Sequence, residues 1–414
     1  MVCVPSAGYD PISVPKRRKE NGVNKLPVLI PNEEYKDRVR RLQQAMAAED
    51  LDAVLCYANS SVYQNVRYLC NYWPMFETGG ILVPRKGDPK ILIGGEAPGA
   101  VRTAFGPENV RVSSDFGHAH AKFKWVGVQY YTMQELFDEA TDGQGMKRLG
   151  ISDYAITPHS MYEHLKEALA PGGEIVRVER MLLDLRMNKS ENEIRLIREG
   201  CRINELVFED ILGTITPEMT EMEVAGMINS SIYKHGGEGP NFPTYVFSGE
   251  NSRNAMGRNT YDRLGEGRMI YVNYGAQYGG YASAFARPFI FGKMTDEMKR
   301  DIDFLSEVHK TIMFDVAKAG VLSGEVYDRF AKMFTDRGYG MPPASASHGI
   351  GVFEGEPPTF RHDMDYELKS GMTISGDHYF RGPDYGFRLE DVYLIGQDSN
   401  EVFTRSHWDE YIEL

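Results

Sequence analysis

The chain has 414 residues, 42% of them hydrophobic, and a formal net charge of −13 from 46 Lys and Arg against 59 Asp and Glu. This composition is ordinary for a globular protein of two or three domains. The acidic surplus argues against nucleic-acid binding through a basic surface. No stretch reaches the ~18–20 apolar residues that span a bilayer, so neither nucleic acid nor a membrane is expected as a partner.

The first 30 residues, which begin MVCVPSAGYDPISVPKRRKENGVNK, carry Lys and Arg but no apolar segment. A secretory signal needs such a segment, so none is expected. We predict a loose arm over 1–30, either a partly disordered tail or an arm that wraps a partner subunit. The cysteines form no CxxC pair, which is typical of reduced thiols in a cytoplasmic protein; they are Cys3, Cys56, Cys70 and Cys201.

Helix and strand patterns alternate over residues 31–178. Apolar residues recur at helical spacing over 32–52 and are followed at once by AVLCYA at 53–58, which predicts a short buried strand. Segment 79–95 predicts two strands joined by a turn of Pro, Gly and Lys. Two further strands are predicted at 148–153 and 174–180, with a helix between them at 156–170. The alternation indicates an α/β layer domain over 31–178.

A second domain is predicted over 179–414. It opens with a long amphipathic helix at 189–212, whose apolar residues fall near one face. Three more helices are predicted at 220–236, 296–317 and 323–338, and five strands at 245–249, 268–275, 282–292, 371–379 and 387–396. This pattern favours helices packed on one face of a curved antiparallel sheet.

Six segments of this second half resemble, in order and with similar gaps, the pita-bread domain shared by prolidase, aminopeptidase P and creatinase. The first helix of that domain resembles LRMNKSENEIRLIREGCRIN, and the later motifs resemble FSGENSRNAM, NYGAQYGGYASAFARPF, SHGIGVFEGEPP, GMTISGDHYF and FRLEDVYLI. The resemblance implies an α/β (α+β) protein with a creatinase-type α/β domain followed by a pita-bread domain.

The resemblance also implies where metal ligands would lie. Peptidases of this family hold two metal ions with Asp, Asp, His, Glu and Glu, and the matching positions are Asn273, Ala284, His348, Asp377 and Glu390. Divalent ions need carboxylate and imidazole donors. Ala284 offers no donor and Asn273 only a neutral oxygen, so we expect the two-metal site to fail and no cofactor to bind. One ion held by His348, Asp377 and Glu390 remains an alternative.

Two imidazoles that the family's peptidases use are also replaced. Met256 and Gly355 stand at their positions. Without metal-activated water and these imidazoles, ordinary peptide hydrolysis lacks its nucleophile and its proton carriers. We therefore expect a protein that is not a standard two-metal aminopeptidase.

Creatinase is similar in fold and works without metal, and this chain resembles that branch. Carboxylates at Asp377 and Glu390 with no metal between them would favour a cationic group of a substrate. His348 is the first acid–base candidate and His378 the second. Arg253 and Arg258 are expected to bind a substrate carboxylate. Together these residues indicate a small charged or zwitterionic substrate.

Further residues expected to line the substrate site are Asn273, Met256, Glu356 and Tyr281. Each functional interpretation has a structural alternative. His348 and Tyr281 could be packing residues, and the two arginines could be solvated loop charges. Asp377 and Glu390 could instead pair with Arg388 or Arg287 in a structural network.

The leading hypothesis is a metal-independent, creatinase-like hydrolase that cleaves a C–N bond, or another carbon–heteroatom bond. The alternatives are a metal-using peptidase or sulfonium-compound lyase of this fold, and a non-catalytic binding protein. The aromatic segment NYWPMFE at 71–77 is expected to lie in a subunit interface, which predicts a homodimer.

Overall fold

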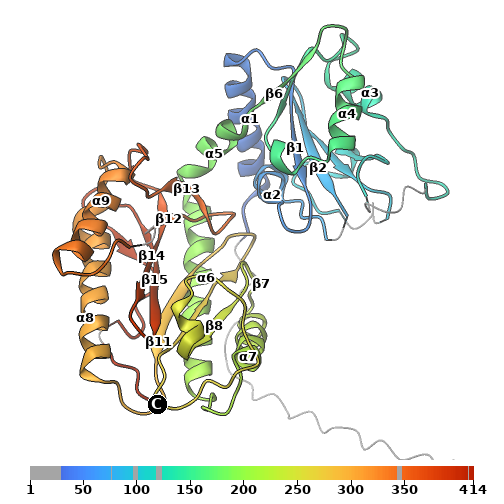
Figure 1. Cartoon of the computed structure of the whole chain (residues 1–414). Helices are drawn as coiled ribbons and strands as arrows, with labels where there is room; N and C mark the ends of the chain where they lie inside the picture. The colour runs from blue at the N-terminus through green and yellow to red at the C-terminus, as the bar shows by residue number, and fades with distance from the viewer. Residues whose placement is uncertain (1–28, 76, 97–100, 118–123, 343–346, 409) are drawn as a thin grey trace, which may run out of the picture.

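The computed structural model describes residues 29–75, 77–96, 101–117, 124–342, 347–408 and 410–414. They form two lobes connected by helix α5 (Glu179–Met187), as Figure 1 shows. The predicted arm lies outside the described residues except for its last two positions. None of the described helices combines the length and apolarity needed to cross a membrane.

The first lobe contains, among its described residues, a six-stranded sheet in the order β4-β3-β2-β1-β5-β6. Pairing is antiparallel between β1, β2 and β3 and parallel between the other neighbours. The strands are β1 (Ala53–Ala58), β2 (Gly79–Pro84), β3 (Lys90–Ile93), β4 (Val110–Val112), β5 (Arg148–Ile151) and β6 (Glu174–Arg177). The helices are α1 (Asn32–Ala48), α2 (Gln64–Cys70), α3 (Met133–Ala140) and α4 (His159–Glu167).

Strand β1 is buried along its whole length because helices cover both faces of the sheet. Val54 and Cys56 point into one apolar core with Leu42 of α1. Leu55 points into another core with Leu136 of α3. This two-sided burial explains why the strand reads as an unbroken apolar run, and the predicted α/β layer architecture is confirmed.

The second lobe is built on a curved sheet in the order β13-β12-β14-β15-β11-β9-β8, with β16 paired to β15. Every pairing that joins these strands is antiparallel. The strands are β8 (Tyr245–Ser248), β9 (Ile270–Tyr274), β11 (Phe285–Phe289), β12 (His348–Gly349), β13 (Glu356–Thr359), β14 (Thr373–Arg381), β15 (Gly386–Leu394) and β16 (Glu401–Val402). A separate small ladder joins β7 (Gly239–Pro240) and β10 (Ala276–Gln277).

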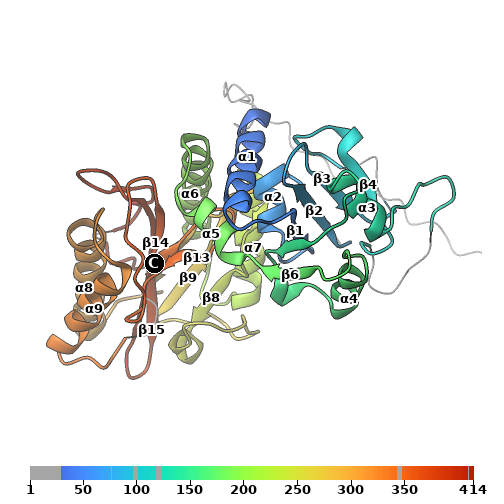
Figure 2. The ribbon, with the colours of Figure 1, turned by 90° about the horizontal axis from the view of Figure 1, so that it is seen from above.

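Helices pack against this sheet in two pairs (Figures 1 and 2). The first pair, α6 (Glu191–Leu212) and α7 (Glu221–Lys234), lies beside β8, β9 and β11. The second pair, α8 (Asp296–Thr311) and α9 (Ser323–Asp336), covers the β14–β15 region. The predicted helices on a curved antiparallel sheet are therefore confirmed. The domain limits of 31–178 and 179–414 stay predictions.

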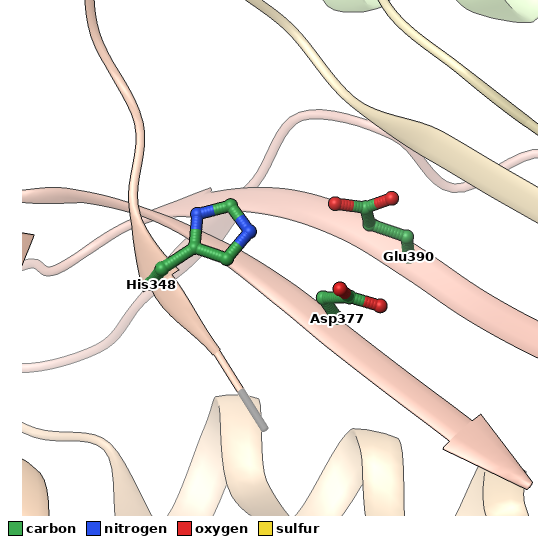
Figure 3. A group of neighbouring side chains, drawn as sticks. All are labelled: His348, Asp377 and Glu390. Atoms are coloured by element: carbon green, nitrogen blue, oxygen red, sulfur yellow. The ribbon is translucent and has the colours of Figure 1, made fainter. Parts of the chain in front are cut away.

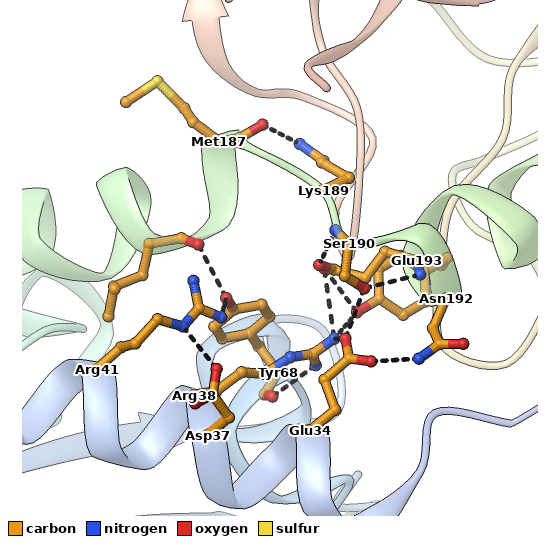
Figure 4. A network of polar contacts seen from close by, with 12 residues as sticks. Glu34, Asp37, Arg38, Arg41, Tyr68, Met187, Lys189, Ser190, Asn192 and Glu193 are labelled. Atoms are coloured by element: carbon orange, nitrogen blue, oxygen red, sulfur yellow. Dashed lines mark hydrogen bonds and ion pairs between the residues drawn. The ribbon is translucent and has the colours of Figure 1, made fainter. Parts of the chain in front are cut away.

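A buried polar network joins the lobes where α1 meets the start of α6 (Figure 4). The Arg38 side chain, only 1% exposed, donates to the carboxylate of Glu34 at 2.7 Å and to the Tyr68 carbonyl at 2.9 Å. Arg38 also donates to the hydroxyl of Tyr281 at 3.0 Å, and that hydroxyl donates to Glu193 at 2.9 Å. Each of these buried charges therefore has a partner of opposite sign.

Candidate functional site

Three side chains that the sequence analysis selected converge on one side of the sheet: His348 from β12, Asp377 from β14 and Glu390 from β15 (Figure 3). One possible ligand atom from each lies within 4.8 Å of the others. The register explains this, because Asp377 lies opposite Glu390 and His348 lies opposite Ser375. Residues two apart on a strand share a face, so all three point the same way. We call these three residues the central cluster.

Glu390 is buried and both of its carboxylate oxygens accept hydrogen bonds. The Ser375 hydroxyl donates to one oxygen at 2.6 Å, and the Asn273 amide nitrogen donates to the other. The Asn273 oxygen in turn accepts from the Arg388 guanidinium at 2.8 Å. Asn273 therefore lies in the site as a hydrogen-bonding side chain whose donor and acceptor are both engaged.

Arg388 brings a buried positive charge into the site. Its Nε lies 3.3 Å from an Asp377 oxygen, and its Nη2 donates to the Ala255 carbonyl at 2.7 Å. Burial would lower the pKa of the Arg388 guanidinium, but Asp377, Tyr271, Glu390 and Glu354 together outweigh that effect and raise the pKa. Arg388 is named from sequence only as a possible structural partner of Asp377 and Glu390. Its position two residues before Glu390 on the same strand placed it on the same face.

His348 forms an ion pair with Glu354, a residue that the sequence analysis did not select. His348 Nε2 lies 3.0 Å from a Glu354 oxygen. Burial would lower the pKa of His348, but the charge and hydrogen bond of Glu354 outweigh it and raise the pKa to about 10. Burial would raise the pKa of Glu354, but the charge and hydrogen bond of His348, together with the charge of Arg388, outweigh burial and hold that pKa below its ordinary value. The imidazole is therefore protonated at neutral pH.

The charges of the site nearly balance. Burial, followed by repulsion from Asp377 and Glu354, raises the pKa of Glu390 to about 8. Three carboxyl groups face two cations, Arg388 and His348. Asp377 has a positive partner in Arg388, as the structural alternative expected. One carboxyl group is in excess, and it takes up either a proton or an external cation.

His378 does not join the central cluster. It follows Asp377 on β14, so its side chain points to the opposite face. There its Nδ1 lies 2.7 Å from Nδ1 of His309, whose Nε2 lies 2.8 Å from Asp391. Burial and His309 hold the pKa of His378 well below its usual value. His378 as a second acid–base residue of the site does not fit this geometry.

Glu356 and Tyr281 are buried in ionic networks outside the central cluster. Glu356 binds Lys189 at 2.8 Å and also Arg186. Tyr281 belongs to the network between the lobes, through Arg38 and Glu193. Their hydrogen-bonding groups are engaged by the protein, so the structural alternative fits both residues better than a role in lining the substrate site.

The loop after β8 carries the remaining predicted residues. Met256 is 74% exposed and Arg258 is also exposed. Neither is brought to the central cluster by any hydrogen bond or ion pair of the described residues. Arg253 is half-buried, donates to Glu250 at 2.9 Å and lines a cleft at the far end of β14. Arg253 therefore lies beside a cavity.

The donor set does not fit a two-metal centre. Ala284 is buried and has no donor atom, and the Asn273 oxygen already accepts from Arg388. The central cluster supplies three donors of the right types for one ion. Two of those donors are engaged, however, since both Glu390 oxygens accept hydrogen bonds and His348 Nε2 pairs with Glu354. Asp377 Oδ1 lies 3.3 Å from Arg388 Nε and accepts no hydrogen bond from the described residues. A single ion would have to displace these contacts.

Comparison with known proteins identifies both lobes. Residues 38–188 match the Creatinase/Prolidase N-terminal domain, and residues 195–397 match Metallopeptidase family M24. The chain is 27% identical over 372 residues to an Xaa-Pro dipeptidase of Pyrococcus horikoshii, covering 89% of this chain and 97% of that protein. It is 25% identical over 373 residues to the Xaa-Pro dipeptidase of Pyrococcus furiosus, covering 90% and 98%.

Solved structures agree with this result. A prolidase from Pyrococcus horikoshii superposes with a TM-score of 0.75 at 25% identity, covering 90% of this chain and 99% of that one. An Xaa-Pro dipeptidase from Bacillus anthracis superposes with a TM-score of 0.77 at 24% identity, covering 92% and 100%. The predicted creatinase-type domain followed by a pita-bread domain is confirmed.

Proposed function

Because the chain belongs to the pita-bread family of creatinase, aminopeptidase P and prolidase, a family of hydrolases, we propose that it hydrolyses a C–N bond of a small charged molecule without the family's two-metal centre. The observation that carries this proposal is the pair Asn273 and Ala284. Ala284 has no donor, and Asn273 binds Glu390 and Arg388 through its amide. The three possible ligands that remain, His348, Asp377 and Glu390, have ligand atoms within 4.8 Å of one another.

His348 and Glu390 supply the proton transfers in this proposal. Water attacks the carbon of the C–N bond through an oxygen lone pair and gives a proton to ionised Glu390. The electron pair of the breaking bond stays on nitrogen, which takes a proton from the His348 imidazolium. A proton then returns from Glu390 to His348 and restores both groups. The close approach within the central cluster supports this return, since its ligand atoms lie within 4.8 Å of one another.

The charge balance supports a substrate with a cationic group. One carboxyl group of the site is in excess, so a guanidinium, amidinium, ammonium or sulfonium group beside Asp377 and Glu390 would complete the balance. A carbon–heteroatom bond other than C–N is compatible with the same residues. The substrate's anionic end is expected to lie near Arg253. Arg258 is exposed, so the proposed site does not include it.

A second candidate function is peptide hydrolysis with a single metal ion. Two observations favour it: three donors lie within 4.8 Å of one another, and relatives are named Xaa-Pro dipeptidases. When bound, such an ion would polarise a carbonyl group or lower the pKa of water. His348, Asp377 and Glu390 would hold it. A dipeptide carries an ammonium and a carboxylate group, so it has one cationic and one anionic end, as the proposed substrate does.

The test is a hydrolysis panel with and without a chelator. The panel contains guanidino, amidino, quaternary ammonium and sulfonium acids together with Xaa-Pro dipeptides. Turnover of a cationic acid that survives the chelator supports the proposal. Turnover of Xaa-Pro that a chelator abolishes would overturn it in favour of the single-metal peptidase. Binding without turnover across the panel would favour a non-catalytic binding protein. A homodimeric state and a cytoplasmic location stay predictions.

A further inference from the structure

A cleft of about 390 Å³ lies at the Arg381 end of β14. His348 pairs with Ser375, nearer the other end of this strand. The lining of the cleft combines two guanidinium groups with apolar and aromatic side chains, namely Arg253, Phe334, Tyr339, Met341, Tyr379 and Arg381. We propose that this cleft binds the carboxylate of a substrate through Arg253 and Arg381, with an aromatic or branched aliphatic group of the same molecule against its apolar wall. This inference rests on the proposed function and names its substrate class.

The cleft and the central cluster share strand β14. Asp377, Tyr379 and Arg381 alternate on β14 and therefore share a face. The Ala255 carbonyl, whose residue lines the cleft, accepts from the Arg388 guanidinium. The Arg381 guanidinium and the Asp377 carboxylate therefore lie on one face of β14, four residues apart.

The two arginines have capacity to bind a ligand. Among the described residues, no carboxylate lies within ion-pair distance of Arg381, which is exposed. Arg253 uses Nη1 to bind Glu250, while its Nε is buried and has no hydrogen-bond partner in the described part of the chain. Guanidinium groups bind carboxylates through paired N–H groups. Both residues can therefore donate to one ligand.

The charge and lining of the cleft select the ligand class. Two guanidinium groups and the Glu250 carboxylate give a net charge of about +1, which one carboxylate neutralises and a doubly charged phosphate monoester exceeds. Phe334, Tyr339 and Met341 form an apolar surface, and Met341 is 69% exposed. Burial of an apolar group against this surface adds to the charge-assisted contacts.

Calorimetric titration with hippurate, an aromatic carboxylate, tests the inference, with hippuramide as its neutral counterpart. Wild-type protein is expected to bind hippurate at least about 10-fold more tightly than hippuramide, because a charge-assisted hydrogen bond is lost in the amide. Arg381→Ala is expected to raise the Kd of hippurate about 10-fold or more, and Arg253→Lys to raise it by less. Arg195→Ala is the matched control, since Arg195 is an exposed arginine on α6, a helix that contributes no residue to this cleft.

Equal affinity for hippurate and hippuramide, or a Kd that Arg381→Ala leaves unchanged, would overturn the subsite. A loss of the same size in Arg195→Ala would also overturn it, because binding would then follow net charge alone. The outcome is separable from that of the proposed function. Arg381-dependent hippurate binding with no turnover in the hydrolysis panel supports the cleft and rejects the reaction. Turnover with Arg381-independent binding supports the reaction and rejects the cleft.

Discussion

His348 Nε2 lies 3.0 Å from a carboxylate oxygen of Glu354, and this ion pair keeps the imidazole protonated well above neutral pH. Replacing Glu354 by Gln removes the largest influence that raises the pKa of His348, so we expect that pKa to fall from about 10 toward neutrality. Titration of the histidine ring protons by NMR measures it. Glu266→Gln, at an exposed position, is the control and should leave the titration unchanged.

The pKa values of Glu390 and His348 predict the pH dependence of hydrolysis. Glu390 must be ionised to accept a proton, so kcat/KM should rise as pH passes about 8. His348 must be protonated to donate one, so kcat/KM should fall as pH passes about 10. In Glu354→Gln the alkaline limb should move to lower pH, and the acidic limb should also move to lower pH, because Glu354 repels ionised Glu390. A profile flat from pH 6 to 11 would contradict these roles.

Substitutions at the two proton carriers should separate binding from rate. His348→Ala should lower kcat by about 10²–10⁴-fold with a smaller change in affinity, as loss of a general acid does. Glu390→Gln should also weaken binding of cationic ligands, because it removes the excess carboxyl group of the site. Steady-state kinetics and titration of a cationic ligand measure both effects. Variants equal to wild type in both measurements would mean that the chemistry lies elsewhere.

Restoring the two missing acids should restore metal binding. We expect the wild-type protein to carry no stoichiometric transition metal, because Ala284 has no donor and Asn273 is held by Arg388 and Glu390. The double variant Asn273→Asp with Ala284→Asp has four carboxylates and one imidazole at the five ligand positions, with Asp377 in place of the family's Glu, and should bind about two ions per chain. Elemental analysis after dialysis against Mn²⁺, Co²⁺ or Zn²⁺ measures both proteins. About two ions per wild-type chain would refute the metal-independent proposal.

The network between the lobes predicts a large stability effect. Arg38→Ala leaves the buried carboxylate of Glu193 without its cation and should cost about 3–5 kcal/mol of unfolding free energy. Arg40→Ala, on the same helix but 56% exposed, should change stability by about 0.5 kcal/mol or less. Urea unfolding of both variants measures the difference. Equal midpoints would show that the Arg38 network contributes little.

The homodimer prediction rests on the aromatic segment 71–77. Two of its side chains, Trp73 and Met75, are 39% and 80% exposed, as an interface loop of the free chain would be. Light scattering at micromolar concentration should give twice the 46.8 kDa of one chain. Changing Met75 to Glu should shift the mass toward that of a monomer. A mass of one chain for the wild-type protein would reject the prediction.

Much of the fold could be predicted from sequence because local patterns carry it. The apolar run AVLCYA predicts a buried strand, and β1 covers the same residues. Ser190 and Glu193 form a capping box, and the helix predicted from 189 begins at Glu191. The motif spacing placed His348, Asp377 and Glu390 in one site, and the structure brings their side chains together. The absence of a ligand at Ala284 is likewise a property of the sequence.

Tertiary structure alone decided how these side chains are partnered. Strand alternation turns His378 away from Asp377, toward His309 on α8, and that pairing depends on which helix covers the back of the sheet. Glu354 and Glu356 are two residues apart, yet one binds His348 and the other binds Lys189. Long-range packing sets the burial and the partner of each charge, and those two quantities determine its pKa. The sequence therefore determined which donors are present, and the folded chain determined which of them remain free to act.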